Sequence, residues 1–118
     1  MKLIVKKQYQ VGGHIYTVVL DADLEKQNDW GVTDHISQRI YINPFRAESQ
    51  MTESLIHELI HIVDEVFLHH ELGEVHVSNL AQGLLQIIIQ HEIKLDWSEI
   101  PYKSNEILPQ GEKEKSEE

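Results

Sequence analysis

The sequence predicts an α+β fold, in which a small N-terminal antiparallel or mixed sheet of three to four strands precedes two packed helices. Before about position 44, short β-branched and aromatic runs alternate with turn residues, a pattern typical of strands. From about Ser49 onward, apolar residues recur every three or four positions, as they do on amphipathic helices. Strands followed by helices, rather than alternating with them, favour the α+β class.

The strands are expected in the first third of the chain. A short alternating stretch begins it, and a turn at Gly12 and Gly13 leads into a run rich in valine and aromatic residues. The polar segment 21–29 is expected to form a loop or one helical turn. A further strand ends at Pro44, since a proline disfavours continuation. The expected strands are residues 2–7, 15–20, 30–33 and 39–43.

Two helices are expected after the strands. The first runs from about Ser49 to about His70 and ends near Gly73, because a glycine commonly follows the last helical turn. The second spans about Glu74 to His91. Residues 94–108 show no clear period, and we expect them to be irregular, with a few side chains docked on the core: Trp97, Ile100 and Tyr102.

Length and composition limit the classes of protein. A chain of 118 residues fits one domain, which we assign to residues 1–108. Residues 109–118 lack large apolar side chains and are expected to form a disordered acidic tail. The chain has no cysteine, which excludes disulfides and thiolate metal sites. Its net charge of −10 disfavours binding to nucleic acid.

No segment has the pattern of an export signal or a membrane span. The apolar run Leu3–Val5 is followed by two lysines and is too short for a secretory signal. The run Ile87–Ile89 lies between glutamines, whereas a span needs about 20 apolar residues. We therefore expect a cytoplasmic protein that does not bind membranes.

The first predicted helix contains His57, Glu58 and His61 in the pattern H-E-x-x-H. Residues four apart share one helix face, so the two imidazoles can hold one zinc ion. A bound cation lowers the pKa of its water toward about 7, and Glu58 is then expected to act as general base. The three residues lie on the polar side of the helix, which is also what a solvated surface helix presents. Both interpretations stay open.

A zinc site of this type needs a third protein ligand. Glu74 opens the second helix at the margin of its apolar stripe, and we expect its side chain to point toward the first helix. Alternatively, Glu74 is simply an acid that suits a helix N-terminus. Other candidates for the third ligand are Glu71, Glu65 and His76.

On these motifs, residues 30–90 resemble small gluzincin-type zinc metallopeptidases, including ImmA/IrrE-like and phage-encoded minimal forms. Larger gluzincins often carry E-x-x-x-D-x-x-A on the second helix. The same register here holds Glu74, Ser78 and Ala81, so a serine replaces the aspartate. The resemblance implies Glu74 as third ligand. Asp64, one turn after His61, is then the candidate to support a metal-bound histidine in place of the missing aspartate.

The resemblance further implies that strand 38–43 is the sheet edge beside the cleft, where a peptide pairs as an added strand. The alternative is that Ile40 and Ile42 are core residues of a strand paired on both sides. The metzincin extension is absent, because Asp64 and Phe67 stand where that motif has glycine and histidine.

We therefore expect a zinc-dependent hydrolase, a metallopeptidase in which His57, His61 and Glu74 hold Zn²⁺ and Glu58 is the general base. Its partner would be a peptide or protein substrate. One alternative is a zincin-fold binding or regulatory module whose metal is structural or vestigial. Another is a metal-free helical interaction domain that dimerises through the stripe Leu84–Ile89. The sequence leaves substrate, oligomeric state and oxyanion-stabilising residue open.

Overall fold

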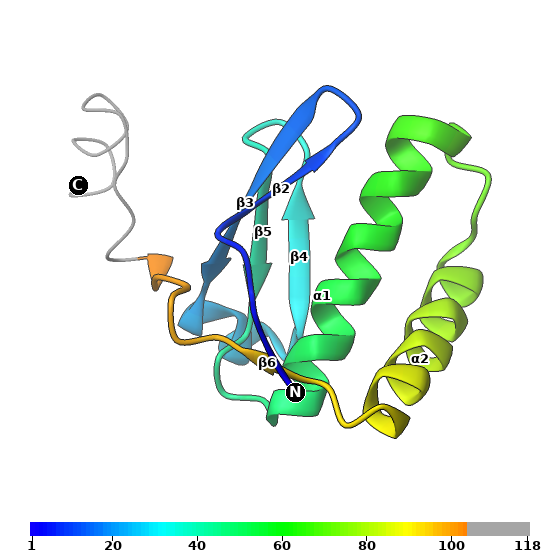
Figure 1. The fold of residues 1–118 in the computed structure, drawn as a ribbon. Helices are drawn as coiled ribbons and strands as arrows, with labels where there is room; N and C mark the ends of the chain where they lie inside the picture. The colour runs from blue at the N-terminus through cyan, green and yellow to red at the C-terminus, as the bar shows by residue number, and fades with distance from the viewer. Residues whose placement is uncertain (104–118) are drawn as a thin grey trace, which may run out of the picture.

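The computed structural model describes residues 1–103 and shows a sheet beside two helices that run in opposite directions (Figure 1). The α+β prediction is confirmed. The expected acidic tail, residues 109–118, lies outside the described residues. The strands are β1 (Lys2–Ile4), β2 (Gln8–Val11), β3 (His14–Leu20), β4 (Gly31–Asp34), β5 (Arg39–Ile42) and β6 (Lys94–Asp96).

The helices follow the predicted order. The first, α1 (Glu48–Val63), continues into one wider π turn, η2 (Asp64–Leu68). The second, α2 (Glu74–Gln90), packs on α1. A short 3₁₀ helix, η1 (Ala22–Gln27), fills the polar segment after β3. Among residues 1–103, no helix is long and apolar enough to cross a membrane.

The main sheet has the strand order β2-β3-β5-β4. Strands β3 and β5 are parallel, and the two outer pairs are antiparallel. Because β5 pairs on both sides, the expectation that strand 38–43 is the edge is wrong. Ile40 and Ile42 are fully buried, as expected for a central strand, and the sheet edge next to α1 is β4.

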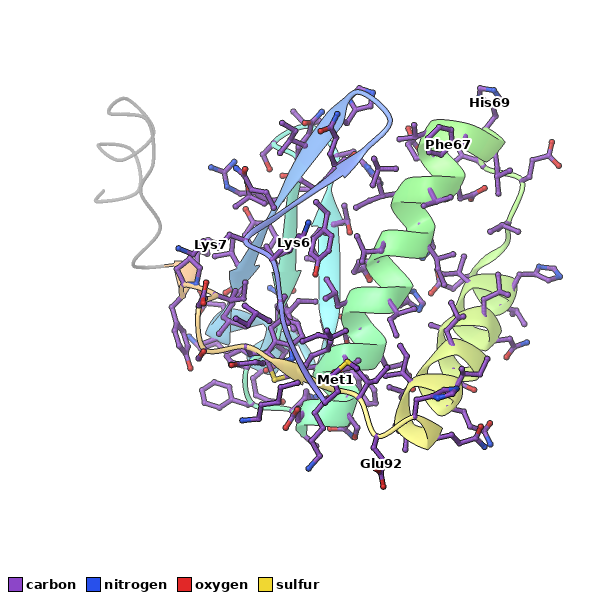
Figure 2. All side chains as sticks on the ribbon, viewed as in Figure 1. Met1, Lys6, Lys7, Phe67, His69 and Glu92 are labelled. Carbon is purple, nitrogen blue, oxygen red and sulfur yellow. The ribbon has the colours of Figure 1, made fainter. Side chains whose placement is uncertain are left out.

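A second, two-stranded sheet joins the ends of the described chain. Residues 94–96, expected to be irregular, form β6 and pair in parallel with β1. The pairing brings Met1 close to Glu92, whose carbonyl accepts a hydrogen bond of 3.1 Å from the terminal amine (Figure 2). Local periodicity does not reveal such a pairing, because each strand has only three residues and its partner is distant in the chain.

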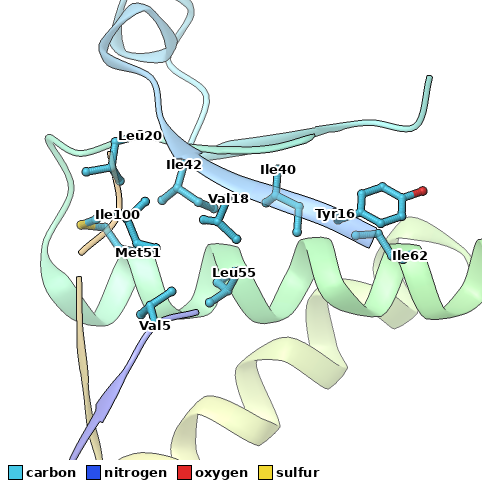
Figure 3. Close-up of a cluster of buried hydrophobic side chains, with 10 residues drawn as sticks. All are labelled: Val5, Tyr16, Val18, Leu20, Ile40, Ile42, Met51, Leu55, Ile62 and Ile100. Atoms are coloured by element: carbon cyan, nitrogen blue, oxygen red, sulfur yellow. The ribbon is translucent and has the colours of Figure 1, made fainter. Parts of the chain in front are cut away.

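The core lies between the sheet and one side of α1 (Figure 3). Val18, Ile40 and Ile42 of the sheet pack against the helix side that carries Leu55 and Ile62. This packing fixes the rotation of α1 about its axis. The opposite, polar side of the helix, which carries the H-E-x-x-H residues, is thereby turned toward β4 and α2.

Candidate metal centre

Three side chains from the two helices converge on one point. The Nε2 atom of His57 lies 2.8 Å from Oε1 of Glu74, and Nε2 of His61 lies 2.8 Å from Oε2. The two imidazole nitrogens are 3.1 Å apart. Within residues 1–103, this is the one group of three or more histidine, aspartate or glutamate side chains placed to hold a metal ion.

The fold brings these residues together through one helical turn and one tight connection. His57 and His61 are one turn apart on α1, and Glu74 is the first residue of α2. Between the helices, His69 and His70 both have left-handed backbone conformations, with φ of 52° and 63°. Two consecutive residues of this kind reverse the chain over a short distance, which places the start of α2 beside the end of α1.

Hydrogen bonds can satisfy this arrangement in one state of the imidazoles. If both Nε2 atoms carry protons, each donates to a different oxygen of Glu74, and the two nitrogens, 3.1 Å apart, form no hydrogen bond with each other. If either Nε2 is unprotonated, its lone pair faces a carboxylate oxygen at 2.8 Å. A cation between the two Nε2 atoms and the carboxylate is the alternative, because it accepts a lone pair from each of the three side chains.

The residues present fit a zinc ion. Tetrahedral zinc with ligands at about 2.0–2.1 Å holds those ligands about 3.3 Å apart. The Nε2–Nε2 separation of 3.1 Å, and the separations of 2.8 Å from each Nε2 to a different oxygen of Glu74, are a few tenths of an ångström shorter. Two imidazoles and one carboxylate, with a fourth position left for solvent, form a donor set used by catalytic zinc.

Glu58 is held beside this group by the neighbouring strand. Its side chain is largely buried, and its Oε1 accepts a hydrogen bond of 2.7 Å from Oγ1 of Thr33 in β4. Among the described residues, nothing bonds to the second carboxylate oxygen. The carboxylate is therefore fixed in direction by one oxygen and has the other free to take a proton.

A cavity of about 310 Å³ opens next to Glu58. It lies between the start of β4 and the two helices, and its lining includes Trp30, Gly31, Glu53, His57, Glu58 and Ser78. A second cavity, of about 320 Å³, lies near the N-terminus of α1 and touches none of these six residues. The first cavity therefore gives a small molecule or a side chain access to Glu58 and one imidazole.

Strand β4 leaves half of its backbone groups at an open edge. The carbonyl of Trp30 accepts a hydrogen bond of 2.9 Å from the amide of Asn43. Since pairing alternates along an antiparallel ladder, Val32 also bonds toward β5, whereas Gly31 and Thr33 direct their backbone groups away from it. No other strand of residues 1–103 pairs with β4.

Gly31 stands where β4 is closely packed. A Cβ atom at this position would lie 3.2 Å from the carbonyl oxygen of Tyr41 in β5 and 3.4 Å from Cβ of Ser54 in α1. The first distance is tight and the second is an ordinary contact. The glycine therefore avoids crowding within the sheet at the strand that faces the helix carrying Glu58.

Asp64 does not support the histidines in the way that its position one turn after His61 predicts. Its buried carboxylate accepts a hydrogen bond of 3.1 Å from the amide of Leu72, and it makes no hydrogen bond to His57 or His61. The proposed support of a metal-bound histidine by Asp64 is therefore wrong. The carboxylate instead satisfies a backbone amide where the connection between the helices folds back over the end of α1.

Asp64→Ala is expected to lower the free energy of unfolding by about 1–3 kcal/mol, because the amide of Leu72 is left without its acceptor. Urea denaturation followed by circular dichroism measures the change. Asp64→Asn keeps an acceptor oxygen and should have a smaller effect. Equal stability of the alanine variant and the unchanged protein would contradict this role.

The other candidates for the third ligand do not join the group. Glu65 pairs with His70, through Oε2 and Nε2. Glu71 and His76 are exposed and lie outside the convergent set. Of the four candidates for the third ligand, Glu74 alone contacts both imidazoles.

Two residues at the site had no signal in the sequence. Thr33 and Glu53 belong to no motif, and their positions depend on β4 lying against α1. Comparisons with known protein families, with curated proteins and with solved structures found no match.

Proposed function

We propose that this protein is a zinc-dependent hydrolase that cleaves peptide bonds. The observation that carries the proposal is the convergence of both Nε2 atoms, of His57 and His61, on the carboxylate of Glu74. Two imidazoles and one carboxylate placed in this way can hold a divalent cation. We further propose a cytoplasmic location, which the absence of cysteine favours.

When bound, zinc would polarise a carbonyl and make water more acidic. The two imidazoles and Glu74 would hold it. Glu58 would accept the proton of the attacking water on its free oxygen and pass it to the nitrogen that leaves. Thr33 keeps the carboxylate pointed in one direction during both transfers, so little reorganisation is needed.

The open edge of β4 suits an extended peptide. The free backbone groups of Gly31 and Thr33 can pair with a peptide as an added strand. A peptide held there runs past Thr33, whose side chain contacts Glu58. The edge thus supports a peptide as the substrate class.

A second candidate is a binding module in which the metal is structural. The cavity of about 310 Å³ favours it, since it lies at the small end of the range for ligand sites, about 300–1,000 Å³. A structural metal, however, has no need of a buried carboxylate aimed by a hydroxyl group. The arrangement of Glu58 and Thr33 therefore favours the hydrolase.

The test has two parts. Elemental analysis of the purified protein is expected to give one zinc per chain after reconstitution. Mass spectrometry of a peptide library incubated with the zinc-loaded protein is expected to show cleavage that a chelator abolishes. Zinc without cleavage would favour the binding module, and the absence of both would refute the proposal.

Thr33→Val is expected to lower kcat about tenfold or more and to leave zinc content unchanged, because a hydrogen bond to a charged group contributes about 1.5–3 kcal/mol. Thr33→Ser retains the hydroxyl and should restore most of the activity. Steady-state kinetics on one cleaved peptide measures both variants. Activity of the valine variant equal to that of the unchanged protein would show that the hydroxyl does not position Glu58.

A further inference from the structure

One acidic side chain in the cavity has no use in the chemistry described above. Glu53 lies one turn before His57 on α1 and lines the cavity together with Glu58 and Trp30. Its side chain is half-buried. Among the described residues, its carboxylate forms no hydrogen bond and no ion pair. This carboxylate is therefore available to pair with a cationic group that enters the cavity.

The charges around the cavity do not balance without a further cation. The two charges of a divalent ion in the centre would be neutralised by the carboxylates of Glu74 and Glu58. The negative charge of Glu53 would then have no counterion. Arg46 lies over the ring of Trp30, at 5.6 Å from its centroid. Arg46 already pairs with Glu25 at 3.0 Å.

The shape of the cavity suits one long side chain. Its volume of about 310 Å³ holds a side chain rather than a whole large ligand. Trp30 provides an apolar and aromatic wall, Gly31 opens the side next to the peptide edge, and Glu53 provides the single unpaired charge. A lysine or arginine side chain packs its methylene groups on such a wall while its charged end meets a carboxylate.

We propose that this cavity selects substrates with a lysine or arginine next to the cleaved bond, and that Glu53 is the residue that determines this specificity. The inference rests on the proposed peptidase function, because it assumes that a peptide lies along β4. The net charge of −10 further favours the approach of basic peptides.

The experiment compares peptides that differ in one charge. A peptide library carries arginine, citrulline or glutamate at one position at a time, and kcat/KM is measured with the zinc-loaded protein. Citrulline has the shape of arginine without its charge. The affinity of the same peptides for the zinc-loaded, inactive Glu58→Gln variant is measured by fluorescence anisotropy, so that recognition is read without turnover.

For one position beside the cleaved bond, the peptide with arginine is expected to have a kcat/KM and an affinity about tenfold higher than those of the peptide with citrulline. Glu53→Gln should bring this ratio close to one by lowering the values for the arginine peptide. Glu92→Gln removes the same charge at an exposed position outside the cavity and should keep the ratio.

The inference would be overturned if the arginine-to-citrulline ratio were near one in the unchanged protein, or if the ratio persisted in Glu53→Gln. It would also be overturned if no peptide bound. The proposed function fails separately. If no peptide is cleaved but the inactive variant still prefers arginine through Glu53, the proposed function fails, and the part of the inference that remains is that Glu53 recognises a basic side chain in a binding module. If peptides are cleaved without a preference for arginine, the peptidase stands and the inference fails.

Discussion

Glu58→Gln should lower kcat by at least about a hundredfold and leave zinc binding intact. General acid–base catalysis contributes typically 10²–10⁴-fold, and an amide oxygen cannot take a proton from water at neutral pH. The substitution is nearly isosteric, and the amide oxygen can still accept the hydrogen bond from Thr33. Folding and metal binding should therefore be unaffected.

The measurement pairs steady-state kinetics on a cleaved peptide with elemental analysis of the same sample. Glu71→Gln is the matched control, since Glu71 is exposed and lies outside the convergent group. Activity of Glu58→Gln within a few-fold of the unchanged protein would assign the general base to another residue. A parallel loss of zinc would instead assign Glu58 a role in binding the metal.

The second large effect is the coupling of zinc to stability. At a free concentration of about 1,000 times its dissociation constant, a ligand of the folded state adds about 4 kcal/mol of stability. In a domain of this size, about 1 kcal/mol corresponds to a shift of roughly 4–8 °C in Tm. Saturating zinc should therefore raise Tm by at least about 10 °C, and a chelator should reverse the rise.

This shift should depend on the three convergent residues. His57→Ala and Glu74→Gln each remove one donor atom, so zinc should raise their Tm by only a small fraction of the shift in the unchanged protein. Glu65→Gln is the control, because Glu65 pairs with His70 instead. Differential scanning calorimetry with and without zinc measures all four proteins. An equal shift in His57→Ala would place the zinc elsewhere.

Much of the fold follows from local pattern. Apolar residues that recur every three or four positions predict both α1 and α2, and the β-branched runs predict β3 and β5. The sheet edge did not follow, because β4 and β5 both read as short extended segments and their order depends on the crossover from β3. The pairing of β1 with β6 joins segments far apart in the chain, and no local pattern encodes it.

For the site, the sequence contained the spacing of His57 and His61 and the position of Glu74 at the margin of an apolar stripe. These are properties of single helices, which periodicity reveals. The roles of Thr33, Glu53 and Asp64 depend on which element packs beside each of them. Asp64 shows this most clearly, since the connection between the helices provides its hydrogen-bond donor.

The central claim is that one divalent ion occupies the space among His57, His61 and Glu74. A crystal soaked with zinc and measured at the zinc absorption edge tests it directly. We expect one anomalous peak about 2.0–2.2 Å from both Nε2 atoms and from a carboxylate oxygen of Glu74. A map with no peak there, or with zinc bound only by other residues, would contradict it.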